Sequence, residues 1–200
     1  MGQLQPVFYY DLGSPHCYMV AETIMATLPV VPEWEPVLGS DVAPPGPDPE
    51  TPDRGQIEAL AKELGLQPIR WPAIWPPDSG RAMLAATYAK RIGRAVAFSL
   101  AAFRQTFAGG RDLTDEDTVL IAGAACEMHP VAHTKGMGLR STADALTSAN
   151  ERARAAGIAT LPAIQMDERT YDISLVEREL ELVTRSLPDG KLEQYMIMAK

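Results

Sequence analysis

The amino-acid sequence predicts an α/β protein whose mixed core is interrupted by an all-helical insertion. Three observations lead to this fold class. A run rich in aromatic and β-branched residues at positions 6–12 is followed at once by a serine–proline helix start. Apolar residues then recur at helical spacing over residues 79–108. Further along, the spacing becomes strand-like over residues 161–173.

Local signals define the elements of the first quarter. After the strand at residues 6–12, Ser14 is expected to cap a helix over residues 15–27, with Pro15 at its first position. Residues 33–38 suit a second strand. Twelve of the 17 prolines lie between positions 29 and 77, so the segment 39–52 is expected to be an exposed loop.

The middle of the chain is predicted to be helical. Asp53 and the Thr-Asp-Glu-Asp run at residues 114–117 are typical helix starts. Between them, residues 67–77 are rich in proline, carry two tryptophans and are expected to be extended. The predicted helices cover residues 53–64, 79–108 in two parts, and 119–128.

The last quarter returns to mixed structure. A helix that begins near Ser141 is expected to stop at Gly157. Two strands follow at residues 161–166 and 170–173, and Ser174 is expected to cap a last helix through residue 187.

Without the helical block, the order of elements is βαβ–αββα, which is that of thioredoxin. We therefore expect a thioredoxin-like domain formed by residues 1–52 and 141–200. Residues 53–140 form an inserted helical domain in this interpretation.

The acidic residues are unevenly distributed. The net charge is −8, and residues 1–53 contain eight acids and no base, whereas the other 18 acids are matched by 18 bases. No basic segment precedes an apolar run as in a secretory signal, and no apolar run approaches the length of a membrane span, about 18 residues. A basic patch for nucleic acid is also missing from the sequence. We expect a cytoplasmic protein that binds neither membrane nor nucleic acid.

Cys17 and Cys126 are the two cysteines, and they lie far apart in sequence. A disulfide framework is not expected in a reducing compartment. His129 and His133 have helical spacing, but Pro130 lies between them and no third ligand is apparent. The sequence therefore predicts no metal site.

The start of the first helix carries the strongest chemical signal. Ser14, His16 and Cys17 lie where unpaired N–H groups and the helix dipole favour a negative charge, such as a thiolate. The Thr160-Leu161-Pro162 segment opens a late strand. Pro162 is a candidate cis-proline, and the Leu161 backbone could pair with an extended thiol peptide.

Residues 8–18, Phe-Tyr-Tyr-Asp-Leu-Gly-Ser-Pro-His-Cys-Tyr, resemble the opening of the DsbA-like superfamily. Within it, the motif is most similar to that of 2-hydroxychromene-2-carboxylate isomerases and kappa-class glutathione transferases. Those proteins carry Ser-Pro-Tyr-Ser or a relative, where the oxidoreductases carry Cys-Pro-His-Cys. Weaker matches extend the resemblance over nearly the whole chain, at residues 35–38, 75–78, 103–107 and 157–162.

The resemblance implies roles for particular residues. Ser14 corresponds to the serine that activates the thiolate of bound glutathione, and Leu161-Pro162 to the segment that pairs with the glutathione backbone. Asp78 lies near a position where the family tends to have a peptide-binding asparagine. The family's Asp-Arg pair is missing, and Asp172 or Ser174 could substitute for it.

The leading hypothesis is a glutathione-dependent isomerase or transferase that acts on a small, conjugated, hydrophobic substrate. Ser14 is its catalytic residue, and the resemblance also implies a homodimer. We expect Trp71, Trp75 and Met83 to form apolar walls of the site. Because glutathione carries two carboxylates, arginines of the later chain are expected to face the cleft, such as Arg81, Arg104 or Arg169.

Two alternatives remain open. The His16-Cys17 ending resembles that of the oxidoreductases, so the chain could be a thiol–disulfide oxidoreductase relative that uses Cys17 alone. The missing Asp-Arg pair instead favours a binding module of thioredoxin fold that has no catalytic activity.

Overall fold

A computed structural model describes residues 5–28, 30–42, 53–167 and 169–173. The helix predicted to begin at Ser174 lies outside the described residues. No helix of the described part is long and apolar enough to cross a lipid bilayer.

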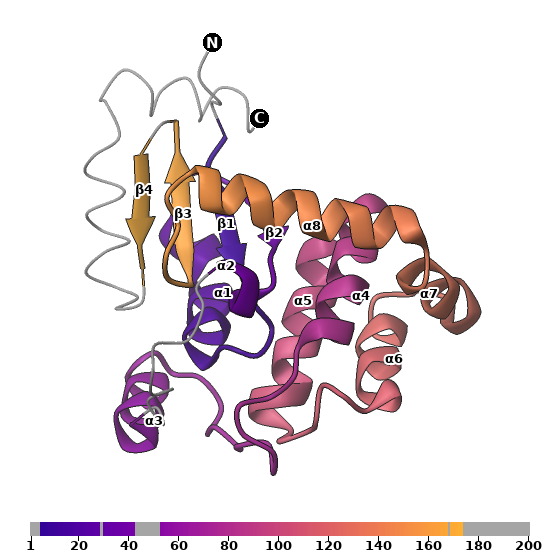
Figure 1. The fold of residues 1–200 in the computed structure, drawn as a ribbon. Coiled ribbons are helices and arrows are strands. Elements are labelled where there is room, and N and C mark those ends of the chain that lie inside the picture. Colours follow the sequence, from indigo (N-terminus) through magenta and orange to yellow (C-terminus); the bar gives the residue numbers. More distant parts are fainter. Residues whose placement is uncertain (1–4, 29, 43–52, 168, 174–200) are drawn as a thin grey trace.

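The described structure contains one sheet of four strands, with the order β2-β1-β3-β4 (Figure 1). The strands are β1 (Val7–Tyr10), β2 (Glu33–Pro36), β3 (Ala163–Met166) and β4 (Arg169–Asp172). β1 pairs in parallel with β2 and antiparallel with β3, and β3 pairs antiparallel with β4. The predicted thioredoxin order of strands is confirmed.

Helices cover both faces of the sheet. Phe8 and Tyr10 alternate with Val7 and Tyr9 along β1, so each pair of side chains lies on a different face. The first pair belongs to a large apolar cluster that includes α1 (Pro15–Thr27). The second pair packs in a smaller cluster with Ala149 and Ala153 of α8 (Arg140–Ala155), which crosses the sheet in Figure 1.

In Figure 1, most of the all-helical block lies beside β2 and beneath α8, whereas its first helix, α3, lies below α1. Its α4 contacts both β2 and α8. The block comprises α3 (Arg54–Glu63), α4 (Gly80–Arg91), α5 (Ala95–Phe103) with a π-helical turn (Arg104–Ala108), α6 (Glu116–Ala124) and α7 (Pro130–Met137). The large apolar cluster continues from α1 into this block, and the two domain boundaries stay a prediction.

The structure corrects several predicted elements. A short helix, α2 (Gly39–Val42), lies where the sequence predicted only a loop. α6 begins at Glu116 rather than at residue 119, because Asp115 accepts a hydrogen bond from the Asp117 N–H. α7 was not predicted, and it contains Gly136, where an added Cβ would overlap the Tyr88 ring.

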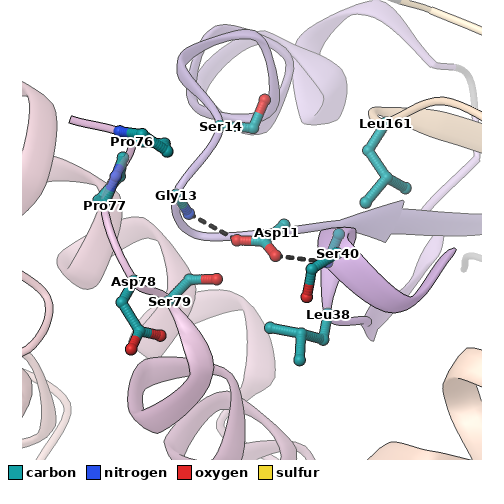
Figure 2. Close-up of a pocket in the computed structure, with 11 residues that line it drawn as sticks. Asp11, Gly13, Ser14, Leu38, Ser40, Pro76, Pro77, Asp78, Ser79 and Leu161 are labelled. Atoms are coloured by element: carbon teal, nitrogen blue, oxygen red, sulfur yellow. Dashed lines mark hydrogen bonds between the residues drawn. The ribbon is translucent and has the colours of Figure 1, made fainter. Parts of the chain in front are cut away.

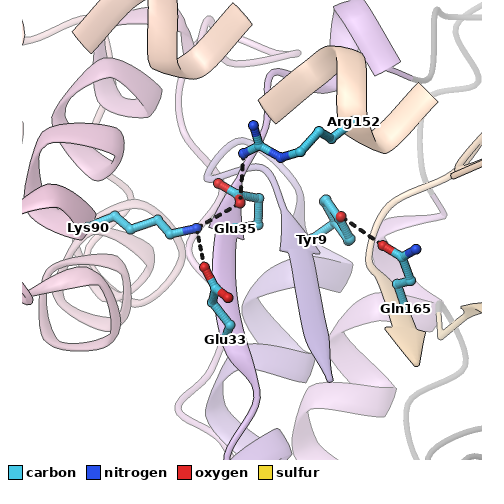
Figure 3. A network of polar contacts seen from close by, with 6 residues as sticks. All are labelled: Tyr9, Glu33, Glu35, Lys90, Arg152 and Gln165. Carbon is cyan, nitrogen blue, oxygen red and sulfur yellow. Dashed lines mark hydrogen bonds and ion pairs between the residues drawn. The ribbon is translucent and has the colours of Figure 1, made fainter. Parts of the chain in front are cut away.

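An ion network joins the sheet to two helices (Figure 3). Lys90 of α4 donates to Glu33 Oε1 and Glu35 Oε2, each at 2.7 Å. Arg152 of α8 donates to the same Glu35 oxygen at 3.0 Å. Because Glu35 is buried, these partners replace the water that its carboxylate loses on folding. The network therefore fixes α4 and α8 against β2.

Candidate functional site

Ser14 begins α1 as the sequence predicted. Its backbone is extended, and its Oγ accepts a hydrogen bond from the Cys17 N–H at 3.2 Å. Pro15 occupies the first helical position, where a missing N–H has no cost. Since a hydroxyl has one hydrogen and two lone pairs, Ser14 can cap the helix and still donate to an anion.

Ser14 lines a cavity of about 440 Å³, a size typical of small-molecule sites. We call it the Ser14 cavity. Figure 2 shows the residues that meet there. Three segments far apart in sequence line it together with Leu161: Asp11 with Gly13 and Ser14, Leu38 to Ser40, and Pro76 to Ser79.

The carboxylate of Asp11 holds these three segments together. Its Oδ1 accepts from the Gly13 N–H at 2.7 Å, and its Oδ2 accepts from the Gly39 N–H at 2.6 Å. The Ser79 side chain makes a further hydrogen bond to it. Burial raises the pKa of Asp11, while these hydrogen bonds oppose the shift because they favour the ionised form.

Leu161 lies across the cavity from Pro76 and Pro77 (Figure 2). The Leu161–Pro162 peptide bond is cis, as the sequence suggested, and so is the Trp75–Pro76 bond, which was not anticipated. The first paired residue of β3 is Ala163, two positions after Leu161. The pairing of the Leu161 backbone with a thiol peptide stays a prediction.

Cys17 and His16 do not line the cavity. The Cys17 side chain is completely buried, and this burial raises the pKa of its thiol to about 12. Hydrogen bonds with the Ser14 side chain and the Asp11 backbone oppose the shift only in part. His16 is half-buried, which lowers its pKa, and the nearby Asp172 opposes this. At neutral pH, therefore, the Cys17 thiol is protonated and the His16 ring is neutral.

The other predicted ligand residues do not lie at a common site. Asp78 lines the cavity and accepts a hydrogen bond from the Gly80 N–H at the start of α4. Asp172 lies at the end of β4, where its carboxylate accepts from the Thr160 hydroxyl at 2.6 Å. Ser174 lies outside the described residues.

The expected arginines do not reach the Ser14 cavity. Arg81 pairs with Glu116 at 2.9 Å, and Arg104 makes two hydrogen bonds to Glu22 on α1. Arg169 is exposed on β4. Within the described ranges, Asp11 and Asp78 are the charged residues that line the cavity, so none of these three arginines faces it as expected.

The expected apolar walls are also corrected. Met83 is completely buried, and its sulfur accepts a hydrogen bond from the Leu12 N–H. Trp71 and Trp75 pack against each other edge to face, with the Arg54 guanidinium over Trp71. The apolar residues that line the cavity are instead Leu38, Pro76, Pro77 and Leu161.

Sequence reasoning missed Asp11 as a site residue. Its position three residues before Ser14 was the available signal, but its partners come from distant segments. In the part of the chain that is described, no group of three or more histidine, cysteine, aspartate or glutamate side chains could hold a metal ion.

Comparison with known proteins gives a result at the level of the fold. No family model and no curated protein matches the chain. A structure of 2-hydroxychromene-2-carboxylate isomerase matches with a TM-score of 0.80 and 13% identity, covering 98% of both chains. The cytosolic disulfide reductase DsbM from Pseudomonas aeruginosa, solved with GSH, has a TM-score of 0.63, 15% identity and the same coverage.

Oxidoreductase DsbA from Xylella fastidiosa is also similar, with a TM-score of 0.57 and 14% identity over 98% of this chain and 84% of that one. Together with the strand order, these matches show that the chain has the DsbA-like thioredoxin fold. The proteins with which it shares this fold include an isomerase and disulfide oxidoreductases.

Proposed function

We propose that the protein is a cytoplasmic enzyme that uses a small thiol, with glutathione as the first candidate, to isomerise or conjugate a small hydrophobic substrate. One observation carries this proposal. Ser14 lies at the N-terminus of α1 and lines a cavity of ligand size that Leu161 also lines. The similar folds of the isomerase and of the reductase solved with GSH support it.

The chemistry assigned to Ser14 is stabilisation of a thiolate. A hydrogen bond from its hydroxyl and the dipole of α1 both favour the charged sulfur over the neutral thiol. The thiolate adds to an electron-poor carbon–carbon double bond, and the π electrons move onto the conjugated carbonyl oxygen. The former double bond can then rotate. Elimination breaks the new carbon–sulfur bond, restores the double bond and regenerates the thiolate, so no oxidant or reductant is needed.

Titration of reduced glutathione by calorimetry tests the proposal. Ser14→Ala removes a charge-assisted hydrogen bond worth about 1.5–3 kcal/mol, so the affinity should fall about tenfold to a hundredfold. Asp115→Ala is the matched control, because it removes the cap of α6, which lies outside the Ser14 cavity. Both variants lose about 1 kcal/mol of stability as caps, but only Ser14→Ala should weaken binding.

If Ser14→Ala and the wild type bind glutathione with equal affinity, Ser14 acts only as a helix cap. Failure of the wild type to bind any small thiol would favour the binding module without catalytic activity.

The oxidoreductase alternative is tested by insulin reduction. Position 14 carries a hydroxyl and the Cys17 thiol is buried and protonated, so the wild type should be inactive. Ser14→Cys creates a Cys-Pro-His-Cys sequence and should introduce a measurable redox couple. Robust insulin reduction by the wild type would reject the isomerase or transferase proposal in favour of this alternative.

A further inference from the structure

The Ser14 cavity combines a helix N-terminus with an acidic lining. At Ser14, the N-terminus of α1 presents the positive end of a helix dipole. The two charged residues that line the cavity, within the described ranges, are both acidic, and the Asp11 carboxylate accepts from the N–H of Gly13, the residue before Ser14. Figure 2 shows Asp11 between the Gly13–Ser14 turn and Ser40, with Asp78 on the side of Pro77.

Asp11 is a buried carboxylate, 7% exposed, whose burial raises its pKa while its hydrogen bonds favour the ionised form. In that form it provides a fixed negative charge that water screens poorly. Each of its oxygens accepts a short hydrogen bond from a backbone N–H, at 2.7 and 2.6 Å, which is the pattern of an ionised carboxylate. The charge cannot move away from the cavity, because Gly13 and Gly39 hold it from two sides.

Asp78 adds a second, weaker negative charge. Its side chain is exposed, and its Oδ1 accepts the N–H of Gly80 where α4 begins. Both solvent and the dipole of α4 therefore reduce its effect on a ligand. The larger effect is expected from Asp11.

We propose that Asp11 is a specificity-determining residue that makes the Ser14 cavity select thiols whose other end is neutral or cationic, with amino-thiols preferred over thiol-carboxylates. This inference rests on the proposed function, because it places the ligand sulfur at Ser14. A ligand with a thiolate and an ammonium group places its cation against this acidic lining. A thiol-carboxylate, glutathione included, brings a further anion towards Asp11 and Asp78. Because the desolvation of that anion is not compensated there, such a ligand binds more weakly than a neutral or cationic thiol.

A series of three small thiols of similar size tests the inference by calorimetry. Cysteamine carries an ammonium group, 2-mercaptoethanol is neutral, and 3-mercaptopropionate carries a carboxylate. We expect affinity to fall in this order, with cysteamine about fivefold to thirtyfold tighter than 3-mercaptopropionate at low ionic strength. Glutathione diethyl ester should likewise bind more tightly than glutathione.

Substitutions of the two acidic residues show which of them causes the preference for amino-thiols. Asp11→Asn removes the charge at nearly constant shape and should reduce the cysteamine-to-mercaptopropionate ratio at least threefold, about twice the reduction from Asp78→Asn. Asp144→Asn, on the exposed side of α8, is the control for overall charge and should leave the ratio unchanged. Any loss of structure in Asp11→Asn weakens all three ligands alike, so the ratio still reports the charge.

The outcomes separate the two proposals. If Ser14→Ala weakens all three thiols but no charge order exists, or the order survives in Asp11→Asn, the selectivity inference is wrong and the thiol site stands. If the charge order depends on Asp11 but Ser14→Ala binds normally, the proposed function fails and the selectivity stands. If no thiol binds to the wild type, both are rejected.

Discussion

Removing the charge of Glu35 should destabilise the protein, because this buried carboxylate connects three elements of the fold. Glu35 on β2 accepts from Lys90 of α4 and Arg152 of α8, and the three side chains are 9%, 25% and 56% exposed. A hydrogen bond to a charged group contributes about 1.5–3 kcal/mol, and the pair with the more exposed Arg152 contributes less than about 1 kcal/mol. We therefore expect Glu35→Gln to lower the free energy of unfolding by about 2 kcal/mol.

For a chain of this size, that loss corresponds to a decrease in Tm of about 4–8 °C. Thermal and urea unfolding of Glu35→Gln, Lys90→Met and the double variant form a double-mutant cycle. Because Lys90 Nζ lies 2.7 Å from Glu35 Oε2, the cycle should give a coupling energy of at least about 1 kcal/mol.

The Arg140–Asp144 pair provides the control for this experiment. Its side chains are 94% and 69% exposed, and the closest charged atoms are 3.9 Å apart. Asp144→Asn should change the stability by less than about 0.5 kcal/mol. If Glu35→Gln has an effect as small as this, or if the Glu35 and Lys90 effects simply add, the reasoning about the network is refuted.

Three further predictions concern other parts of the molecule. Burial lowers the pKa of His133 in the folded state, so stability should decrease as the pH falls through about 6.5, where the unfolded chain begins to bind the proton. His133→Leu should flatten this part of the Tm-against-pH curve, and an unchanged slope would contradict the assignment. Gly136→Ala places a methyl group against the Tyr88 ring and should cost about 1–3 kcal/mol in urea unfolding. Gly138→Ala meets only ordinary contacts and should be nearly neutral; equal effects would argue against close packing at Gly136. The buried, protonated Cys17 thiol should not react with Ellman's reagent until the protein is denatured, and rapid reaction of the native protein would contradict its burial.

The elements that were predicted correctly have strong local signals. α1 has the expected bounds because Ser14 caps it and Pro15 occupies its first position, two effects that act within a few residues. The hairpin of β3 and β4 likewise follows from a short turn between two strand-like segments. Such signals were sufficient for the order of the core elements.

The elements that were missed depend on contacts between distant residues. α7 contains Gly136, which weakens the helical pattern, and the structure shows that this glycine allows close approach to Tyr88 of α4. The site likewise includes a feature that local sequence signals do not predict. The position of Ser14 followed from the local motif, whereas the role of Asp11 depends on Gly39 and Ser79, which only the tertiary structure brings together.

The expectation that Arg81 or Arg104 faces the cavity was wrong for a related reason. Charge balance indicated that glutathione would need cations, but it could not show that Arg81 and Arg104 already pair with Glu116 and Glu22. The cavity is instead lined by two carboxylates within the described part of the chain.

The central claim is that Ser14 and the N-terminus of α1 stabilise a thiolate in the cavity. The most direct measurement is the pH titration of glutathione bound to the protein, followed by the ultraviolet absorbance of the thiolate. We predict that the bound thiol ionises below its usual pKa of about 8.5, and that Ser14→Ala raises this value by about one to two units. A bound thiol that titrates like free glutathione, with no change in Ser14→Ala, would contradict the account.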